Sequence, residues 1–154
     1  MFSEAAIKEL NEIRQKYPDA RAALLPALYI AQREFGYLGS DAYEAVSEAL
    51  GVPKAIARGV GTFYAMYKHK PMGGHIVQLC TSVSCMILGA EKLSDFLKNK
   101  YGLEPGGITS DKRFSLVIME CLGACGTAPA MLVNDDFYEN LTEKYIEEIL
   151  EKYK

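Results

Sequence analysis

The chain has no tryptophan, only two histidines and only four cysteines among its 154 residues. Long apolar runs are also missing, because no stretch approaches the ~18 uninterrupted apolar residues that a membrane-spanning helix needs. Basic side chains are not in excess, since 17 Lys and Arg stand against 20 Asp and Glu and give a formal charge of -3. A nucleic-acid-binding protein needs a basic surface, so this class is excluded, and we expect no direct insertion into a membrane.

An export signal is not visible either. The first residues, MFSEAAIKELNEIRQKY, lack the basic and then apolar layout of such a signal. We therefore expect a cytoplasmic protein, in which an even number of cysteines more often binds metal than forms disulfides. The length and the 49% hydrophobic content are typical of one compact domain, or of a small domain with a helical appendage.

Helical patterns fill the first part of the chain, and we assign residues 1–70 to an N-terminal helical bundle. In the first helix, Ile7, Leu10, Ile13 and Tyr17 recur at steps of three and four, which predicts that they form one buried stripe. Charged residues occupy most of the positions between them. An amphipathic helix of this kind packs against its neighbours through the apolar stripe.

Proline, glycine and serine mark three further helices. Pro26 falls in the first turn of the second helix and Gly36 near its end. Ser40 is expected to cap the third helix through its side chain. Pro53 opens a fourth helix, which we expect to end near residues 59–61, because we interpret the glycines there as turns.

The segment KHKPMGGH at residues 68–75 concentrates proline, glycine and charge, so we place the domain boundary there. Residues 71–154 then form a second domain with a different hydrophobic period. It begins with a predicted strand at 76–79, which is followed by a helix from Met86 to Lys100.

The rest of the second domain alternates strand and helix. The run FSLVIM at residues 114–119 contains β-branched members and predicts a strand buried on both faces. MLVN and FYEN indicate a hairpin. An amphipathic helix, capped by Thr142 or Asn140, closes the chain. The predicted fold class is therefore α+β or α/β, with a helical bundle followed by a compact domain with a sheet.

All four cysteines occur in two short motifs, CTSVSC and CLGAC. Cys80 follows the first predicted strand and Cys121 follows the second. Because a strand, a crossover helix and a second strand of one sheet are normally parallel, both strands end at the same edge. We therefore expect Cys80, Cys85, Cys121 and Cys125 to meet at the carboxyl edge, where open α/β sheets usually bind ligands.

Several residues in and directly after the two motifs are small, which lets backbone amides turn toward sulfur. Such hydrogen bonds stabilise negative charge at a metal-thiolate site and set its reduction potential. The small residues are Thr81, Ser82 and Ser84 in the first motif, and Gly123, Ala124 and Gly126 in the second.

Three chemical species fit four cysteines. A [2Fe-2S] cluster takes two thiolates on each iron, and the spacing favours it, because two separate loops can each supply a pair. Structural zinc bound by four thiolates and two disulfides stay open as alternatives. His69 and His75, the only imidazoles, lie outside both motifs, and Glu120 beside Cys121 is interpreted as a solvated strand end.

These motifs resemble a known family. HIVQLCTSVSCMILGAEKL, CLGACGTAP and MLVND resemble the thioredoxin-like [2Fe-2S] ferredoxin subunit of respiratory complex I, the NADH:quinone oxidoreductase. LPALYIAQREFGYL and GVGTFYAMY resemble helical segments of the same family. The resemblance implies a thioredoxin-like domain in which Cys80 and Cys85 bind one iron and Cys121 and Cys125 bind the other.

The resemblance also implies a function. The chain would carry one [2Fe-2S] cluster beside a partner subunit that binds FMN and NADH, in the peripheral arm of a membrane-associated complex, and would exchange one electron with the flavin. Its own sequence has no G-x-G-x-x-G after a strand and no Walker lysine, so no catalytic or nucleotide site is expected on it.

Other functions stay open. The equivalent subunit of an NAD-linked hydrogenase or formate dehydrogenase has the same motifs, and a zinc-stabilised adaptor or a thiol-disulfide oxidoreductase is a further alternative. The stretch Phe63, Tyr64, Met66 and Tyr67 is compatible with a partner-binding surface or with core packing. The isomer of the bond before Pro129 cannot be read from the sequence.

Overall fold

The computed structural model describes residues 1–153. The chain forms two compact units, Met1–Pro71 and Met72–Lys154, which we call the helical unit and the sheet unit. None of the helices in the described residues has the length and the hydropathy that crossing a membrane requires.

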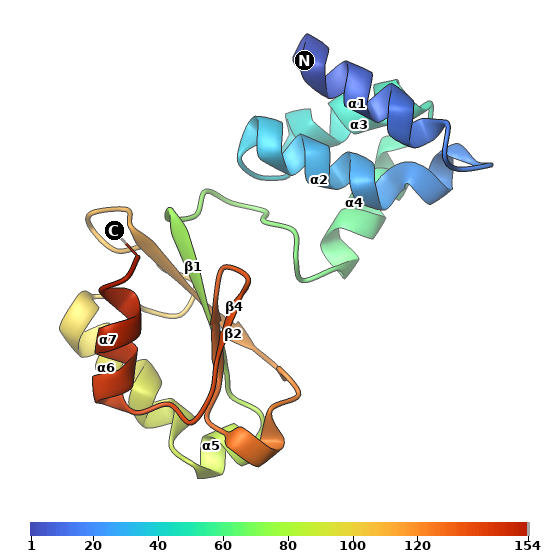
Figure 1. Cartoon of the computed structure of the whole chain (residues 1–154). Coiled ribbons are helices and arrows are strands. Elements are labelled where there is room, and N and C mark those ends of the chain that lie inside the picture. Colours follow the sequence, from blue (N-terminus) through green and yellow to red (C-terminus); the bar gives the residue numbers. More distant parts are fainter. Residues whose placement is uncertain (154) are drawn as a thin grey trace. The chain divides into compact units, whose positions relative to one another are not determined.

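The helical unit contains four α-helices and one 3-10 helix (Figure 1). Its elements are α1 (Glu4–Arg14), η1 (Ala20–Ala23), α2 (Leu24–Phe35), α3 (Ser40–Leu50) and α4 (Lys54–Phe63). Side chains from all of them share one buried core, to which Leu28 and Val46 contribute with no exposed surface. Each helix therefore depends on its neighbours for the burial of its apolar side.

Helix α1 packs through a different stripe from the predicted one. Ala6 and Leu10 are buried and Ile13 is half-buried, whereas Ile7 is 47% and Tyr17 40% exposed. The buried residues still recur at steps of four and three, so the helical period was correct. Leu10 and Ile13 thus lie on the packed side as predicted, whereas Ile7 and Tyr17 do not, and Ala6 is buried in place of Ile7.

The predicted helix ends are confirmed in α2 and corrected in α3. Pro26 lies in the first turn of α2, and Gly36 ends the helix with φ +79°. Ser40 is the first residue of α3 and not its cap, which is Gly39. The Ser40 hydroxyl instead accepts a hydrogen bond from Lys54 Nζ at 3.1 Å, so it links α3 to the start of α4.

Helix α4 begins after Pro53 as predicted but runs through both of its glycines to Phe63. The interpretation of Gly59 and Gly61 as turns was therefore wrong. Gly61 is buried against the ring of Tyr43, and a Cβ atom there would lie 2.5 Å from the Tyr43 hydroxyl oxygen. The glycine serves close packing of α4 on α3 rather than chain reversal.

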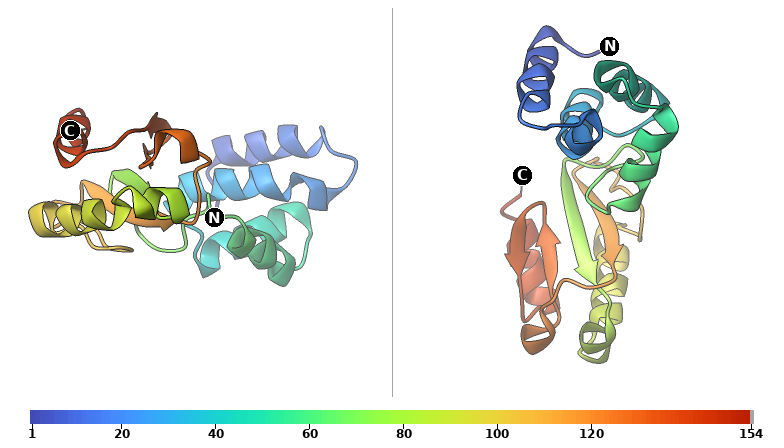
Figure 2. Two further views of the ribbon diagram at one scale, coloured as in Figure 1. Left: turned by 90° about the horizontal axis from the view of Figure 1, so that it is seen from below. Right: turned by 90° about the vertical axis from the view of Figure 1, so that its right-hand side faces the viewer.

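The sheet unit contains a mixed sheet of four strands in the order β2-β1-β3-β4. Strand β1 (His75–Cys80) is parallel to β2 (Phe114–Met119) and antiparallel to β3 (Met131–Val133), which pairs with β4 (Asp136–Tyr138). The right-hand view of Figure 2 shows α6 (Ala90–Tyr101) and α7 (Glu143–Leu150) behind the strands, on one face of the sheet. The core of this unit lies between that face and the two helices.

Strand β2 differs from the prediction of burial on both faces. Its first three residues, Phe114 to Leu116, are buried, but Ile118 near its end is 36% exposed. β2 is an edge strand, and the helices cover one face of the sheet, so its second half lacks neighbours on several sides. The apolar run correctly predicted a strand but not its place in the sheet.

The predicted helix from Met86 to Lys100 is divided in two. Helix α5 (Val83–Ile87) ends at Leu88, and α6 begins after Gly89, which has φ +101°. Glycine adopts this left-handed conformation readily, so it permits the sharp change of direction. The predicted hairpin of β3 and β4 is confirmed, and Thr142 rather than Asn140 caps α7.

Candidate metal centre

The end of the two parallel strands brings the cysteine motifs together. Cys80 is the last residue of β1 and pairs with Met119, the last residue of β2. Cys85 lies in α5, directly after β1, while Cys121 follows β2 and Cys125 begins the 3-10 helix η2 (Cys125–Thr127). Figures 1 and 2 show α5 and η2 at the same end of the sheet. The predicted shared edge is confirmed.

The thiols of the two motifs lie near one another at this edge. All four cysteines are free. The thiols of Cys85 and Cys121 both influence the pKa of Cys80, so side chains of both motifs lie in its surroundings. Cys125 lies close enough to Cys85 for its charge to act on that thiol.

Backbone groups of both motifs act on the Cys80 thiol. Its burial alone raises its pKa, but hydrogen bonding with the backbones of Ser82 and Leu122, together with the neighbouring thiols, lowers the pKa below the ordinary value. A lowered pKa favours the thiolate, which is the form that binds metal. Ser82 is one of the small residues of the first motif, whereas Leu122 of the second motif is large.

The other thiols have different surroundings. Burial and the hydrogen bond with Cys80 raise the pKa of Cys85, against a smaller opposite effect of the Ala130 backbone. The backbone N–H of Gly123 donates to the Cys121 Sγ at 3.3 Å, and Gly123 has φ +77°. The left-handed conformation of Gly123 thus directs its amide toward the Cys121 sulfur, as expected for a ligand loop built from small residues.

The two motifs also differ in burial. Cys80 and Cys85 are 2% and 3% exposed and pack with Ala90, Ala128 and Leu122. Cys121 and Cys125 are exposed. A group bound here would consequently have one side inside the protein and one side at its surface.

The donor set fits a two-iron cluster. Among residues 1–153, no group of three or more His, Cys, Asp or Glu side chains is gathered closely enough to hold a single metal ion. A [2Fe-2S] cluster needs only two thiolates at each iron, and its donors span a wider site than those of one ion. Four free thiols in two motifs, with amides directed at sulfur, have the chemistry that such a cluster needs.

Hydrogen bonds that the sequence did not predict connect the residues after Cys125 to residues 139–141; we call residues 139–141 the strap. The Thr127 hydroxyl donates to the Glu139 carboxylate, and the backbone N–H of Asn140 donates to the Thr127 carbonyl at 2.7 Å. The N–H of Leu141 donates to the carbonyl of Pro129 at 3.1 Å, and the bond before Pro129 is cis. No local pattern signals these contacts, because the partners lie 12 or 13 residues apart.

The other candidate residues lie elsewhere. His75 begins β1, at the end opposite to Cys80, and its Nδ1 lies 3.1 Å from Asn134 Nδ2. His69 Nδ1 lies 3.2 Å from the Tyr43 hydroxyl in the helical unit. Glu120 is exposed. The structure thus pairs both imidazoles with groups other than the four thiols.

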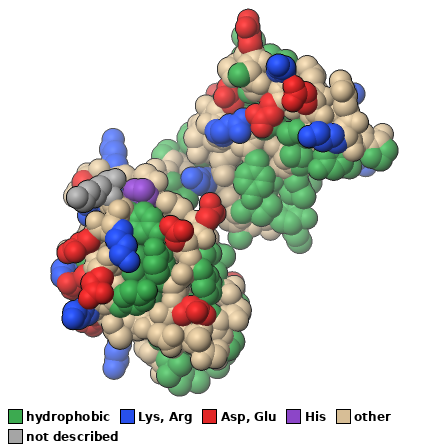
Figure 3. Space-filling model, viewed as in Figure 1, with side chains coloured by type: hydrophobic (Ala, Val, Ile, Leu, Met, Phe, Trp, Pro, Cys, Tyr) green, Lys and Arg blue, Asp and Glu red, His purple; other side chains and the backbone are tan. Residues whose placement is uncertain are grey.

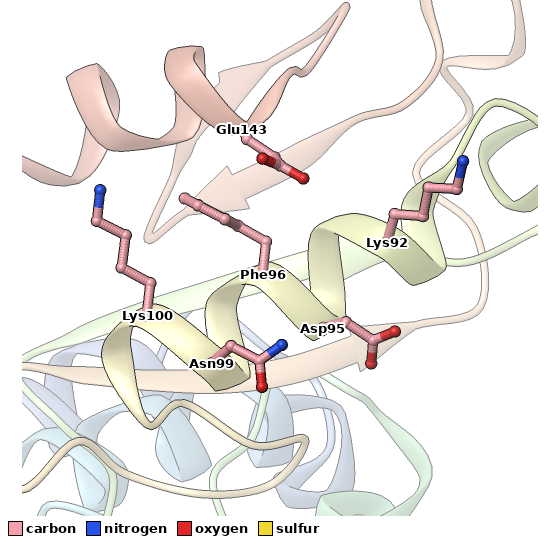
Figure 4. Close-up of a pocket in the computed structure, with 6 residues that line it drawn as sticks. All are labelled: Lys92, Asp95, Phe96, Asn99, Lys100 and Glu143. Carbon is pink, nitrogen blue, oxygen red and sulfur yellow. The ribbon is translucent and has the colours of Figure 1, made fainter.

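A shallow groove lies on the helix side of the sheet unit, with a volume of about 520 Å³. Figure 4 shows five of its lining residues on α6 and one on α7: Lys92, Asp95, Phe96, Asn99, Lys100 and Glu143. Charges of both signs line it, and no cysteine is among the lining residues. The groove is thus separate from the thiol site.

Comparisons with known proteins point to one family. The family described as thioredoxin-like [2Fe-2S] ferredoxin matches residues 10–154. A subunit of the NADH-quinone oxidoreductase of Rhizobium meliloti (strain 1021) is 40% identical over 147 residues, which cover 96% of this chain and 88% of that protein. The corresponding NADH-quinone oxidoreductase subunit of Escherichia coli (strain K12) is 38% identical, over 99% of this chain and 92% of the other.

A solved structure shares the architecture. The chain resembles part of an NAD+-reducing [NiFe]-hydrogenase in the air-oxidized state, with a TM-score of 0.71 and 25% sequence identity. The match covers 84% of this chain but only 22% of the hydrogenase chain. The matching region is therefore one part of a much longer polypeptide in that protein.

Proposed function

Because the chain belongs to the thioredoxin-like [2Fe-2S] ferredoxin family, we propose that it is the electron-transfer subunit of an NADH:quinone oxidoreductase, complex I, and carries one [2Fe-2S] cluster. The observation that carries the proposal is the pair of free-thiol motifs at the shared end of two parallel strands. Relatives named as subunits of NADH-quinone oxidoreductase match nearly the whole chain.

The four cysteines are the proposed ligands. Cys80 and Cys85 bind one iron, and Cys121 and Cys125 bind the other. The effect of the Cys85 and Cys121 thiols on the pKa of Cys80 and the Gly123 amide that donates to the Cys121 sulfur support this assignment. Residues 71–154 form the domain that holds the cluster, and residues 1–70 form a separate helical bundle.

When bound, a [2Fe-2S] cluster accepts or returns one electron. The protein's own task is to hold the thiolates, to direct amides at sulfur and to exclude water on the buried side. Cys80 and Cys85 exclude water from the buried side of the site, because both are almost fully buried.

The partner is a flavin subunit that binds FMN and NADH, in the peripheral arm of a membrane-associated complex on the cytoplasmic side. Apolar side chains beside the thiol motifs support a protein contact there: Val83, Met86, Ile87 and Leu88 are between 45% and 74% exposed. In Figure 3, hydrophobic side chains cover the tip of the sheet unit where α5 lies. A contact at this tip would bring the thiol site close to the flavin, with little water between them.

An NAD-linked hydrogenase is the second candidate parent complex, because the matched solved structure is an NAD+-reducing [NiFe]-hydrogenase. The large subunits that purify with this chain distinguish the two. Nickel and hydrogen-dependent NAD+ reduction in that assembly would support the hydrogenase, whereas NADH-dependent quinone reduction would support complex I.

Anaerobic purification tests the cluster directly. We expect about two iron and two acid-labile sulfide per chain, visible absorption and a paramagnetic signal after reduction. Cys85→Ala should lose most of the absorption, whereas Ser84→Ala, its neighbour in α5, should keep it. Stoichiometric zinc without iron would contradict the proposal and would favour the zinc-stabilised adaptor.

A further inference from the structure

A group of large apolar side chains lies on the surface of the helical unit, outside the unit that contains the cysteines. We call Tyr29, Phe63, Tyr64 and Met66 the aromatic surface; they are 48%, 79%, 37% and 42% exposed. The rings of Phe63 and Tyr64 lie 5.0 Å apart. Figure 3 shows hydrophobic side chains gathered over α2 and the end of α4 on this unit.

One aromatic residue of the same stretch anchors the others. Tyr67 is only 4% exposed, its hydroxyl donates to the Leu25 carbonyl at 2.8 Å, and its ring lies 5.1 Å from that of Tyr29. The segment after α4 is therefore held against α2. Tyr67 therefore holds the aromatic surface in place through its buried contacts with α2.

Helix α4 has an apolar side that is only partly buried. Ala57 and Gly61 are buried, while Ile56 and Phe63 are 37% and 79% exposed. The apolar side of an amphipathic helix normally faces a core, while its polar side faces water. Ile56 and Phe63 belong to the apolar side of α4 but stay exposed, so part of this side lacks a covering element.

The chain segment that carries Phe63, Tyr64 and Met66 has charge of one sign. Residues 49–90 contain no Asp or Glu but have four Lys and Arg, so all 20 acidic residues of the chain lie elsewhere, beside 13 basic ones. Lys54 is paired with Glu44 of α3. Among residues 1–153, neither Arg58 nor Lys68 has an ion-pair partner, which leaves two unpaired positive charges in the segment that carries Phe63, Tyr64 and Met66.

We propose that the aromatic surface binds an apolar face with an acidic rim on a second, different polypeptide of the same oxidoreductase; this rests on the proposed function. Tyr, Phe, Met and Arg are the residues enriched at protein interfaces, and Asp and Glu are depleted there. A second copy fits less well, because a symmetric pair through this face would bring the positive charges of both copies together.

Binding to the assembled enzyme tests the proposal. The probe is the NADH-oxidising assembly purified without this chain, and the measured quantity is the Kd of added chain. Phe63→Ala should weaken binding at least tenfold. Arg58→Glu should slow association and weaken its dependence on salt. Ile7→Ala removes a side chain of α1 that is 47% exposed and should stay within twofold of the wild type.

Cross-linking identifies what lies on the surface. The chain with p-benzoylphenylalanine in place of Phe63 should cross-link, after reconstitution and irradiation, to an acidic peptide of another polypeptide. The same group in place of Ile7 should give at least tenfold less product. Cross-links from position 63 only to a second copy, to lipid or to nucleic acid would overturn the inference, as would unchanged Kd values for both Phe63→Ala and Arg58→Glu.

Iron content and visible absorption separate this inference from the proposed function. If the wild-type chain holds its cluster and binds the assembly while the variants bind equally well, only the aromatic surface is refuted. If the wild-type chain contains no iron and does not bind, both are overturned. The variants should keep the absorption and circular dichroism of the wild type, which shows that they fold.

Discussion

Gly61 and Gly59 provide a matched pair of substitutions within one helix. Both lie in α4, two residues apart, but a Cβ at Gly61 would lie 2.5 Å from the hydroxyl oxygen and 2.7 Å from Cε1 of Tyr43. A Cβ at Gly59 meets no atom within 4 Å. Replacing glycine by alanine changes the helix propensity equally at both positions. The two substitutions therefore differ only in what the new methyl group contacts.

Tyr43 cannot move aside easily. It is only 5% exposed, burial raises the pKa of its phenol, and its hydroxyl lies 3.2 Å from Nδ1 of His69. Overpacking of a core costs about 1–3 kcal/mol. Alanine in place of glycine in a helix contributes about 1 kcal/mol in the opposite direction. The net expected loss for Gly61→Ala is therefore about 0–2 kcal/mol, while Gly59→Ala should gain about 1 kcal/mol.

Urea unfolding followed by far-UV circular dichroism measures both variants, and hydrogen exchange of the α3 and α4 amides localises the change to the helical unit. The free energies of unfolding of the two variants should differ by about 1–3 kcal/mol. Tyr43→Phe removes the closest atom and should reduce the effect of Gly61→Ala. Equal stability of the Gly59→Ala and Gly61→Ala variants would refute the reasoning.

Three further substitutions probe the sheet unit. Tyr153→Phe removes the hydroxyl that donates to Asp136 at 2.5 Å and should lower the free energy of unfolding by about 1–2 kcal/mol in a urea titration. Thr127→Val removes the hydrogen bond to Glu139, so cluster absorption should decay faster on warming, while an unchanged decay rate would show that the strap is not needed. Gly73→Ala places a Cβ 2.7 Å from the backbone of β2 and should destabilise the unit by about 1–3 kcal/mol; a thermal midpoint at or above the wild-type value would contradict this contact.

Local chemistry explains why much of the fold could be predicted. Gly36 and Thr142 end and begin helices through their own backbone or side-chain preferences, which act over a few residues. The continuous apolar run of β2 needs only its own composition to indicate a strand. Cys80 ends β1 and Cys121 follows β2, so their meeting depended on one topological rule about parallel strands.

Features that depend on distant contacts were missed or predicted wrongly. The phase of α1, with Ala6 rather than Ile7 buried, depends on the shape of α2 and α3. The hydrogen bond between Thr127 and Glu139 joins a residue before β3 to a residue after β4.

The sequence by itself determined most of the helices and strands, the parallel strand pair and the two cysteine motifs, since periodicity, caps and spacing act locally. Only the tertiary structure decided that β2 is an edge strand, that Cys80 and Cys85 are buried while Cys121 and Cys125 are exposed, and that Phe63 lies on the surface. Burial is the reason for the difference, because the exposure of a side chain is set by which distant elements cover it, and the same apolar residue suits a core or an interface equally well.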